Sequence, residues 1–294
     1  MAYAFYKLFL HFALRLPDAF FKVLFFIIFP IYKALHTKRA YGRVVSHLQA
    51  TGFSSDSAPG RQQINARDVF KSLYWNGIDS YRLLARIPSA TLRVRYENEH
   101  VIKEALAQGP IVALSIHQGA FENLHRSLCR YSEHVHLITS PFKSTALTRA
   151  LREIRNDKNL HEYSTEEVAT VLRSLFKTNG ILAMVVDQAR DARGNSVELF
   201  GKQSTLYLRL PEKANQMGAG IVTFRTFCET TTDTCGKKFR QHIVRFEKYY
   251  PPKYGKSDTL QAEAPLVKEI ASEIETWIAD HPEQWTWNYH GNFR

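Results

Sequence analysis

The hydrophobic positions of the chain alternate between two spacings along most of its length. "QQINARDVFKSLYWNGIDSYRLLAR" places Val69, Leu73, Ile78 and Tyr81 roughly on one helical face, whereas "GPIVALSI" and "ILAMVVDQ" are short continuous apolar runs. Spacings of three and four residues are typical of helices, and short apolar runs bounded by turn residues are typical of buried strands. Repeated alternation of the two predicts an α/β domain with a central mixed sheet flanked by helices.

Several element boundaries follow from local signals. Ser164 and Glu167 have the spacing of a capping box, and Asn179 followed by Gly180 is a helix stop. Pro141 suits a helix start after the strand "HVHLITS". A helix is also expected from about residue 119 to 131, and "FRQHIVRFEKYY" is expected to return as a strand beside "GIVTFRTF".

The N-terminal segment departs from this alternation. Residues 5–35 are mostly aromatic and aliphatic, interrupted by Lys7, Arg15, Asp18 and Lys22 and closed by Lys33, Lys38 and Arg39. The cleanest apolar stretch, residues 19–32, is shorter than the ~20 residues of a perpendicular span. We therefore expect residues 1–39 to form a retained membrane anchor, either interfacial or single-pass, and residues 40–294 to form one catalytic domain. The alternative is an N-terminal helix packed on the globular core.

Charge narrows the class of partner. The 294 residues carry a formal net charge of +11, which favours anionic lipid, a phosphorylated substrate, an acidic carrier protein or nucleic acid. Nucleic acid is not expected, because no recognition motif accompanies the charge. The three cysteines form no C-x-x-C pair, which favours a reducing compartment.

Candidate chemistry concentrates in "IVALSIHQGAFENLH", where His117 follows an apolar run and precedes Glu122 by five positions. An imidazole between a strand and a helix can take a proton from an alcohol, and a carboxylate behind it can stabilise the imidazolium. A hydrogen-bonded structural histidine is the alternative. Glu122 and His125 also match one E-x-x-H half of a di-iron site, but the second copy is missing.

The order of these features resembles the bacterial lipid A biosynthesis acyltransferases, the lauroyl and myristoyl transferases of the lysophospholipid acyltransferase superfamily. The likeness joins the N-terminal apolar segment, the H-x4-E after a strand, a strand ending in Asp-Gln, and the C-terminal "HPEQWTWNYHGNF". The resemblance implies acyl-carrier protein or acyl-CoA as donor, a lipid acceptor, no metal or bound cofactor, and the cytoplasmic face of a bacterial inner membrane.

The resemblance also assigns roles to individual residues. His117 is then the base and Glu122 its partner. Arg126, Arg155, Asp187, Gln188 and Arg190 are then substrate-binding candidates. Asp187 is expected to be structural or to orient an arginine rather than to act as a second base. Arg190, together with Arg193, Lys202 and Arg209, is expected to recognise phosphate or an acidic carrier, or else to form a solvated basic face.

Three positions depart from the family pattern. Ile116 stands where Asn is common, Ser140 stands where Arg is common, and "WNYHGNFR" replaces the more basic usual ending. These departures point to a branch that acylates something other than a lipid A precursor, such as a glycolipid, an aminolipid or a polyene head group. Two other functions stay open: a lipid-binding protein that has lost the reaction, and a thioesterase in which water replaces the alcohol.

Overall fold

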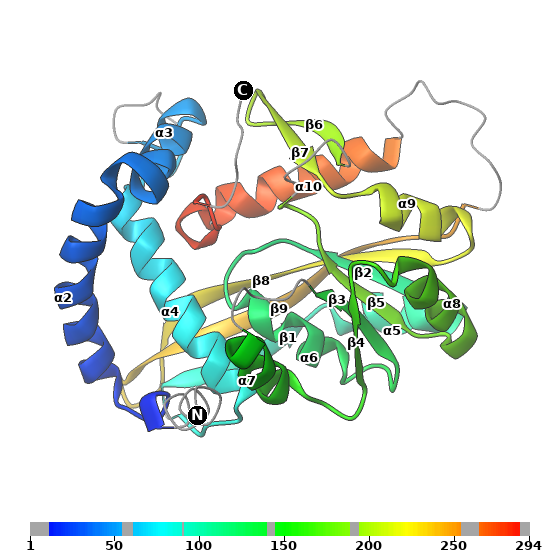
Figure 1. Cartoon of the computed structure of the whole chain (residues 1–294), viewed down its shortest axis with the longest axis horizontal. Coiled ribbons are helices and arrows are strands. Elements are labelled where there is room, and N and C mark those ends of the chain that lie inside the picture. The colour runs from blue at the N-terminus through cyan, green and yellow to red at the C-terminus, as the bar shows by residue number, and fades with distance from the viewer. Residues whose placement is uncertain are drawn as a thin grey trace.

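A seven-stranded mixed sheet forms the centre of the molecule (Figure 1). The structure, a computed structural model, describes residues 12–54, 61–89, 91–139, 145–188, 194–253 and 265–288. The strand order is β1-β9-β8-β2-β5-β3-β4. Only β8 and β9 pair antiparallel within this described sheet, and every other neighbouring pair is parallel. This confirms the α/β class and the mixed sheet.

Strands β6 and β7 form a separate two-stranded sheet. The strands are β1 Leu92–Glu97, β2 Ile111–Ser115, β3 Val135–Thr139, β4 Leu160–Ser164, β5 Ile181–Val185, β6 Asn195–Leu199, β7 Lys202–Leu206, β8 Gly220–Thr232 and β9 Lys238–Tyr250. The helices are α2 Asp18–His36, η1 Thr37–Tyr41, α3 Gly42–Ala50, α4 Ala66–Leu84, α5 Glu99–Gln108, η2 Phe121–Asn123, α6 Leu124–Leu128, α7 Thr145–Arg155, α8 Val168–Thr178, α9 Arg209–Gln216, α10 Pro265–Asp280 and η3 Pro282–Gln284.

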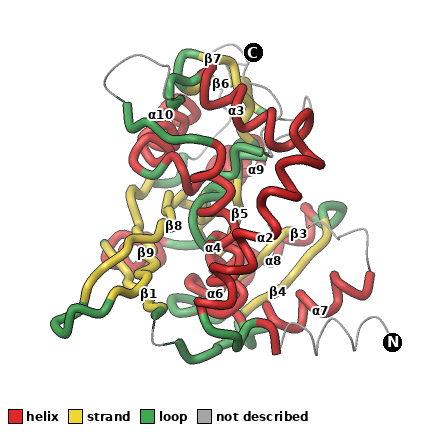
Figure 2. The backbone as a smooth tube through the Cα atoms, turned by 90° about the vertical axis from the view of Figure 1, so that its left-hand side faces the viewer, coloured by secondary structure: helices red, strands yellow, loops and turns green. Residues whose placement is uncertain are grey.

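Helices cover both faces of the sheet, and this explains the continuous apolar strands (Figure 2). Val112 and Leu114 belong to one core cluster, which includes α10 residues such as Ile274. Ile111 and Ala113 belong to a second cluster, on the α5 and α6 side of the sheet. Successive residues of β2 point to opposite faces, so each of them needs an apolar side chain.

Several local predictions are confirmed and others were wrong or incomplete. Asn179 ends α8 in a left-handed conformation, with φ of 52°, as predicted. Helix α8 starts only at Val168, because Ser164 still belongs to β4, although the Ser164 amide does donate to the Glu167 carboxylate. The α5 helix, the β4 strand and the β6–β7 hairpin were not predicted. Pro141 lies outside the described residues.

Helix α2 is long and apolar enough to cross a membrane by length and composition, with a mean hydropathy of 1.6. It lies against α4 on the outside of the domain (Figure 1). Only 11% of the 18-residue apolar stretch of this helix is buried in the molecule. Helix α2 ends at His36, and η1 and α3 follow it directly.

Candidate active site

His117 and Asp187 meet at the carboxyl ends of two neighbouring parallel strands. β2 pairs with β5 in a register that sets Ser115 opposite Val185. His117 and Asp187 each lie two residues farther along, so they continue this register past the last paired residues. The carboxyl end of a parallel sheet is where α/β proteins place their ligands.

Two hydrogen bonds join His117 to the Asp187 carboxylate. Nδ1 of His117 lies 2.6 Å from Oδ1 of Asp187, and the backbone amide of His117 donates to Oδ2 at 3.1 Å. Asp187 is almost fully buried, whereas the His117 side chain is 14% exposed. An ionised carboxylate only accepts hydrogen bonds, so Nδ1 of His117 is the donor in this contact. This leaves Nε2 as the ring nitrogen that can exchange a proton with a substrate.

The C-terminal segment supplies a third contact to the carboxylate. Nε1 of Trp285 donates to Oδ2 of Asp187 at 2.8 Å. Trp285 and Trp287 are fully buried, with ring centroids 4.7 Å apart. The aromatic "QWTW" sequence thus holds the residue that orients the histidine.

The loop after His117 is pinned by the same segment. Gly119 adopts a φ of +57°, and a Cβ atom there would lie 2.5 Å from the carbonyl oxygen of Thr226. The Gly119 amide donates to the Gln284 carbonyl at 3.2 Å, and the Thr286 amide donates to the His117 carbonyl at 3.1 Å. Only glycine fits this turn without moving the backbone of β8.

Gln284 extends the connection to β8. Its side-chain oxygen accepts from the Cys228 amide at 2.7 Å, and its side-chain nitrogen donates to the Cys228 carbonyl at 2.8 Å. Both backbone groups of Cys228 are therefore satisfied by one amide side chain. In the sequence, the C-terminal "HPEQWTWNYHGNF" stands out only through its likeness to the family, whereas these contacts give Gln284 a physical role.

The expected contact between His117 and Glu122 is not found. Glu122 lies in the single turn η2, and its Oε2 accepts from Nη2 of Arg155 at 2.6 Å. Among the described residues, no hydrogen bond or ion pair joins Glu122 to His117. A helix starting at Gly119 was expected to turn Glu122 toward the imidazole. The left-handed turn at Gly119 delays that helix, and Phe121 instead packs edge-on against His117, with ring centroids 4.7 Å apart.

Arg155 and Arg126 occupy different surroundings. Arg155 ends α7, and its pairing partner Glu122 is mostly buried with it. Arg126 donates to the carbonyls of Leu84 and Asn156, so its guanidinium joins the end of α4 to the segment after α7. It also lines a cleft of about 720 Å³ that His117 does not line.

The remaining predicted positions follow Asp187 in the sequence. Gln188 follows Asp187 directly and is partly buried. Arg190 and Arg193 lie outside the described residues. Lys202 begins β7 and Arg209 begins α9. The structure therefore brings together His117 with Asp187, and Glu122 with Arg155, as two separate pairs.

His125 is a buried imidazole close to the Glu122–Arg155 pair. Burial, together with the positive charges of Arg155 and Arg126, lowers the pKa of His125 to about 3. Its Nε2 has no hydrogen-bond partner among the described residues. His125 is therefore neutral at physiological pH and a poor acceptor of a proton.

Asp187 was expected to be structural or to orient an arginine. Its contact with Nδ1 of His117 was not predicted. The signal that could have revealed this was available. Two apolar strands, each with its polar residue just past the end, place these residues side by side if the strands are neighbours.

Comparison with known proteins agrees with this architecture. The family model described as bacterial lipid A biosynthesis acyltransferase matches residues 82–293. No curated protein matches the chain. The matched region begins near the end of α4 and contains β2, β5 and the C-terminal Pro-Glu-Gln segment. The chain belongs to the bacterial lipid A biosynthesis acyltransferase family.

Proposed function

We propose that the protein transfers a fatty acyl chain from an acyl thioester, carried by acyl-carrier protein or CoA, to a hydroxyl group of a lipid A precursor or related glycolipid. The observation that carries this proposal is the 2.6 Å contact between Nδ1 of His117 and Asp187, which leaves Nε2 of a partly exposed imidazole free. An imidazole held in this tautomer suits a general base.

The proposed reaction proceeds without a protein nucleophile. Nε2 of His117 takes the proton of the acceptor hydroxyl as its oxygen attacks the thioester carbonyl, and the buried Asp187 carboxylate stabilises the resulting imidazolium. The tetrahedral intermediate then expels the thiolate, which receives the proton from His117. This sequence needs no metal or bound cofactor.

Arg155 is the candidate for stabilising negative charge in this reaction. Its guanidinium is 13% exposed and is held on one side by the Glu122 carboxylate. A fixed, mostly desolvated cation can stabilise an oxyanion or a substrate phosphate more strongly than a mobile surface cation does. In this proposal Glu122 positions Arg155 and contributes to the site through it.

Membrane association completes the proposal. We place the protein on the cytoplasmic face of a bacterial inner membrane, with α2 as the contacting element. Apolar residues of α2, including Phe20, Val23 and Ile27, are exposed to solvent. An apolar helix surface of this kind on a basic protein suits a lipid acceptor embedded in an anionic membrane.

Purified protein incubated with a labelled acyl thioester tests the proposal, with and without extracted bacterial lipids. Label on a lipid supports acyl transfer, whereas free fatty acid alone would support a thioesterase and no turnover would support a lipid-binding protein. His117→Ala should reduce transfer by about 10²–10⁴-fold while circular dichroism stays unchanged. Mass spectrometry of the labelled lipid would identify the acceptor.

A further inference from the structure

Helix α2 lies side by side with α4 and does not extend away from the domain (Figure 1). At one end the Phe21 ring lies 6.4 Å from the Trp75 ring, and at the other the Tyr32 ring lies 5.2 Å from the Phe70 ring. The Tyr74 hydroxyl also donates to the Phe21 carbonyl at 3.0 Å. One face of α2 is thus committed to α4 along its length.

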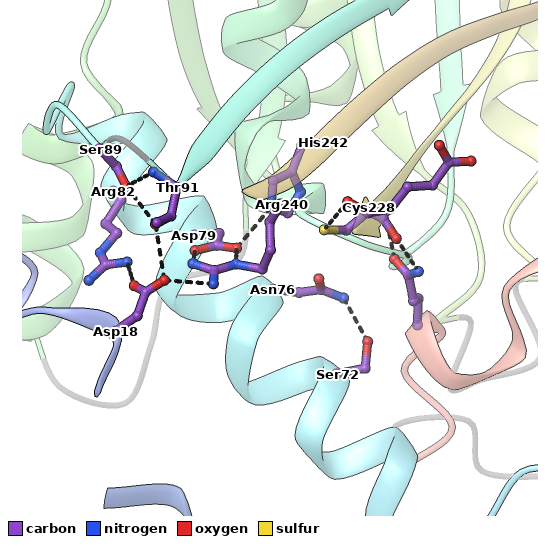
Figure 3. Close-up of polar contacts among 12 residues, drawn as sticks. Asp18, Ser72, Asn76, Asp79, Arg82, Ser89, Thr91, Cys228, Arg240 and His242 are labelled. Atoms are coloured by element: carbon purple, nitrogen blue, oxygen red, sulfur yellow. Dashed lines mark hydrogen bonds and ion pairs between the residues drawn. The ribbon is translucent and has the colours of Figure 1, made fainter. Parts of the chain in front are cut away.

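The first residue of α2 is held by a network of charges (Figure 3). Asp18 accepts hydrogen bonds from Arg82 at 2.6 Å, from Arg240 at 2.8 Å and from Thr91 at 3.0 Å. Arg240 is itself held by two bonds to the buried Asp79, at 2.6 and 2.9 Å. Burial alone would raise the pKa of Asp18, but the hydrogen bonds from Arg240 and Arg82 outweigh it and lower this pKa to about 2. The carboxylate is therefore ionised at neutral pH and secures the start of α2.

The opposite face of α2 is apolar and exposed. Its members recur every three or four residues and so share one face: Phe20, Val23, Ile27 and Ile31. If α2 crossed the bilayer, the attached α4, with its exposed Arg67 and Lys71, would enter the hydrocarbon as well. If α2 lies flat, the apolar face enters the membrane and α4 stays in water.

A groove between α2 and the start of α4 borders this apolar face. It has a volume of about 320 Å³, and its walls are Phe25, Phe26, Phe29, Pro30, Lys33 and Arg67. None of these six described lining residues is acidic. The Arg67 side chain is exposed, and its guanidinium lies 5.7 Å from the centroid of the Phe26 ring. A groove lined by three phenylalanines, one proline and two cations is complementary to an anionic amphiphile.

We propose that α2 lies along the surface of the bilayer and that this groove binds an anionic phospholipid, with Lys33 and Arg67 contacting the headgroup phosphate. The inference rests on the membrane association proposed above. It goes beyond that association by assigning an orientation to the helix, a lipid class to the groove and two residues to the headgroup.

Two charge-matched double variants of the full chain test the groove. Lys33→Gln/Arg67→Gln removes the two cations that line it. Lys22→Gln/Lys71→Gln removes one exposed cation from each of the same two helices, and neither lines the groove. Lys22 lies about three turns before Lys33 on the same side of α2, so diffuse attraction to the surface is lost about equally in both variants.

Sedimentation with phosphatidylglycerol–phosphatidylcholine vesicles then measures the partition coefficient of each variant. We expect the groove variant to lose at least about tenfold more affinity than the control, and vesicles of phosphatidylcholine alone to bind all variants alike. Equal losses in the two variants would overturn the groove and leave the proposed membrane association in place. Failure of the unmodified protein to bind either vesicle would overturn the association, and the groove with it.

The side of the membrane on which the N-terminus lies tests the orientation of α2 separately. An N-terminal epitope tag is followed in inside-out membrane vesicles, whose cytoplasmic face is exposed to added protease. A flat α2 leaves the tag on the same face as the domain, so protease removes it in intact vesicles. A tag that survives until detergent is added would show that α2 spans the bilayer, and the proposed orientation would be wrong.

Discussion

Nδ1 of His117 lies 2.6 Å from Oδ1 of Asp187, and the two residues reach this contact by continuing the β2–β5 register two positions past its end. The partner of the imidazole is thus supplied by the neighbouring strand rather than by the following helix. The pair also depends on Trp285, whose indole donates to the second carboxylate oxygen. Three segments far apart in the sequence therefore determine the orientation of one side chain.

Asp187→Asn tests this relationship. The asparagine amide keeps the size of the side chain but cannot stabilise a positive imidazolium, so we expect the maximal rate of acyl transfer to fall about 10²–10⁴-fold. Initial rates at saturating thioester, with circular dichroism as the folding check, measure the effect. Trp285→Phe keeps the Asp187 carboxylate and removes only the hydrogen bond from the indole, so it should lower the rate less than Asp187→Asn does. An Asp187→Asn protein with near-normal rates would rule out the charge-stabilised pair.

Glu122 and Arg155 should behave as one unit. Glu122→Gln and Arg155→Gln each break the same 2.6 Å ion pair, so we expect the double variant to be little slower than the slower single variant. Glu122→Asp keeps the charge and should retain more activity than Glu122→Gln. Arg152→Gln is the control, because Arg152 is an exposed α7 residue that pairs with Glu162. Additive losses would mean that Glu122 and Arg155 act independently.

Gly119→Ala should destabilise the protein and disturb the site. The new Cβ atom would meet the Thr226 backbone at 2.5 Å in a left-handed conformation, so we expect a loss of ~2 kcal/mol or more in the free energy of unfolding. Gly77→Ala on α4 is the matched control, because nothing lies within 4 Å of the place that its Cβ atom would take. It should be neutral or stabilising by up to ~1 kcal/mol. Urea unfolding compares the two, and equal behaviour would contradict the role given to Gly119.

His242 should make stability depend on pH on the alkaline side. Burial alone would lower the pKa of His242, but the hydrogen bond to Asp79 outweighs it, and the pKa is raised to about 9. A raised pKa means that the stabilisation is complete below about pH 6.5, the unfolded value, and is lost as pH rises through about 9. In thermal unfolding from pH 6 to 10, the melting temperature of the unmodified protein should exceed that of His242→Gln at low pH, and this difference should shrink as the pH rises. A difference that stays constant with pH would contradict the charged His242–Asp79 pair.

Substitutions on the exposed face of α2 test membrane association better than deletion does. Removing residues 1–39 would also remove Asp18 and leave Arg82 and Arg240 without that carboxylate. Val23→Glu/Ile27→Glu places two charges on the exposed face, so we expect the protein to move from the membrane pellet to the soluble fraction. Met217→Glu alters an exposed apolar residue elsewhere and should have no such effect. Unchanged pelleting of the α2 variant in high salt would place the membrane contact elsewhere.

Elements with local causes could be predicted from the residue pattern alone. The alternation of helical and strand spacing predicted the α/β class, the buried strands β2 and β5, and the long helix α4, because backbone geometry imposes those periods on any half-buried or fully buried element. The left-handed stop at Asn179 also follows from a dipeptide signal. His117 stood out for the same reason: it ends an apolar run that only a buried strand explains.

Which side chains face one another depends on the packing of distant segments and could not be predicted from local spacing. Sequence spacing suggested Glu122 for His117, since the two are five positions apart, but the φ of +57° at Gly119 turns the chain and leaves Glu122 to Arg155. Strand order placed β5 beside β2 and so brought Asp187 to the imidazole from 70 positions away. In the same way, α2 reads as a membrane-anchor candidate in sequence, while the bonds of Asp18 to Arg82 and Arg240 fix how it lies. Such contacts depend on packing between distant segments, and the local residue pattern does not predict that packing.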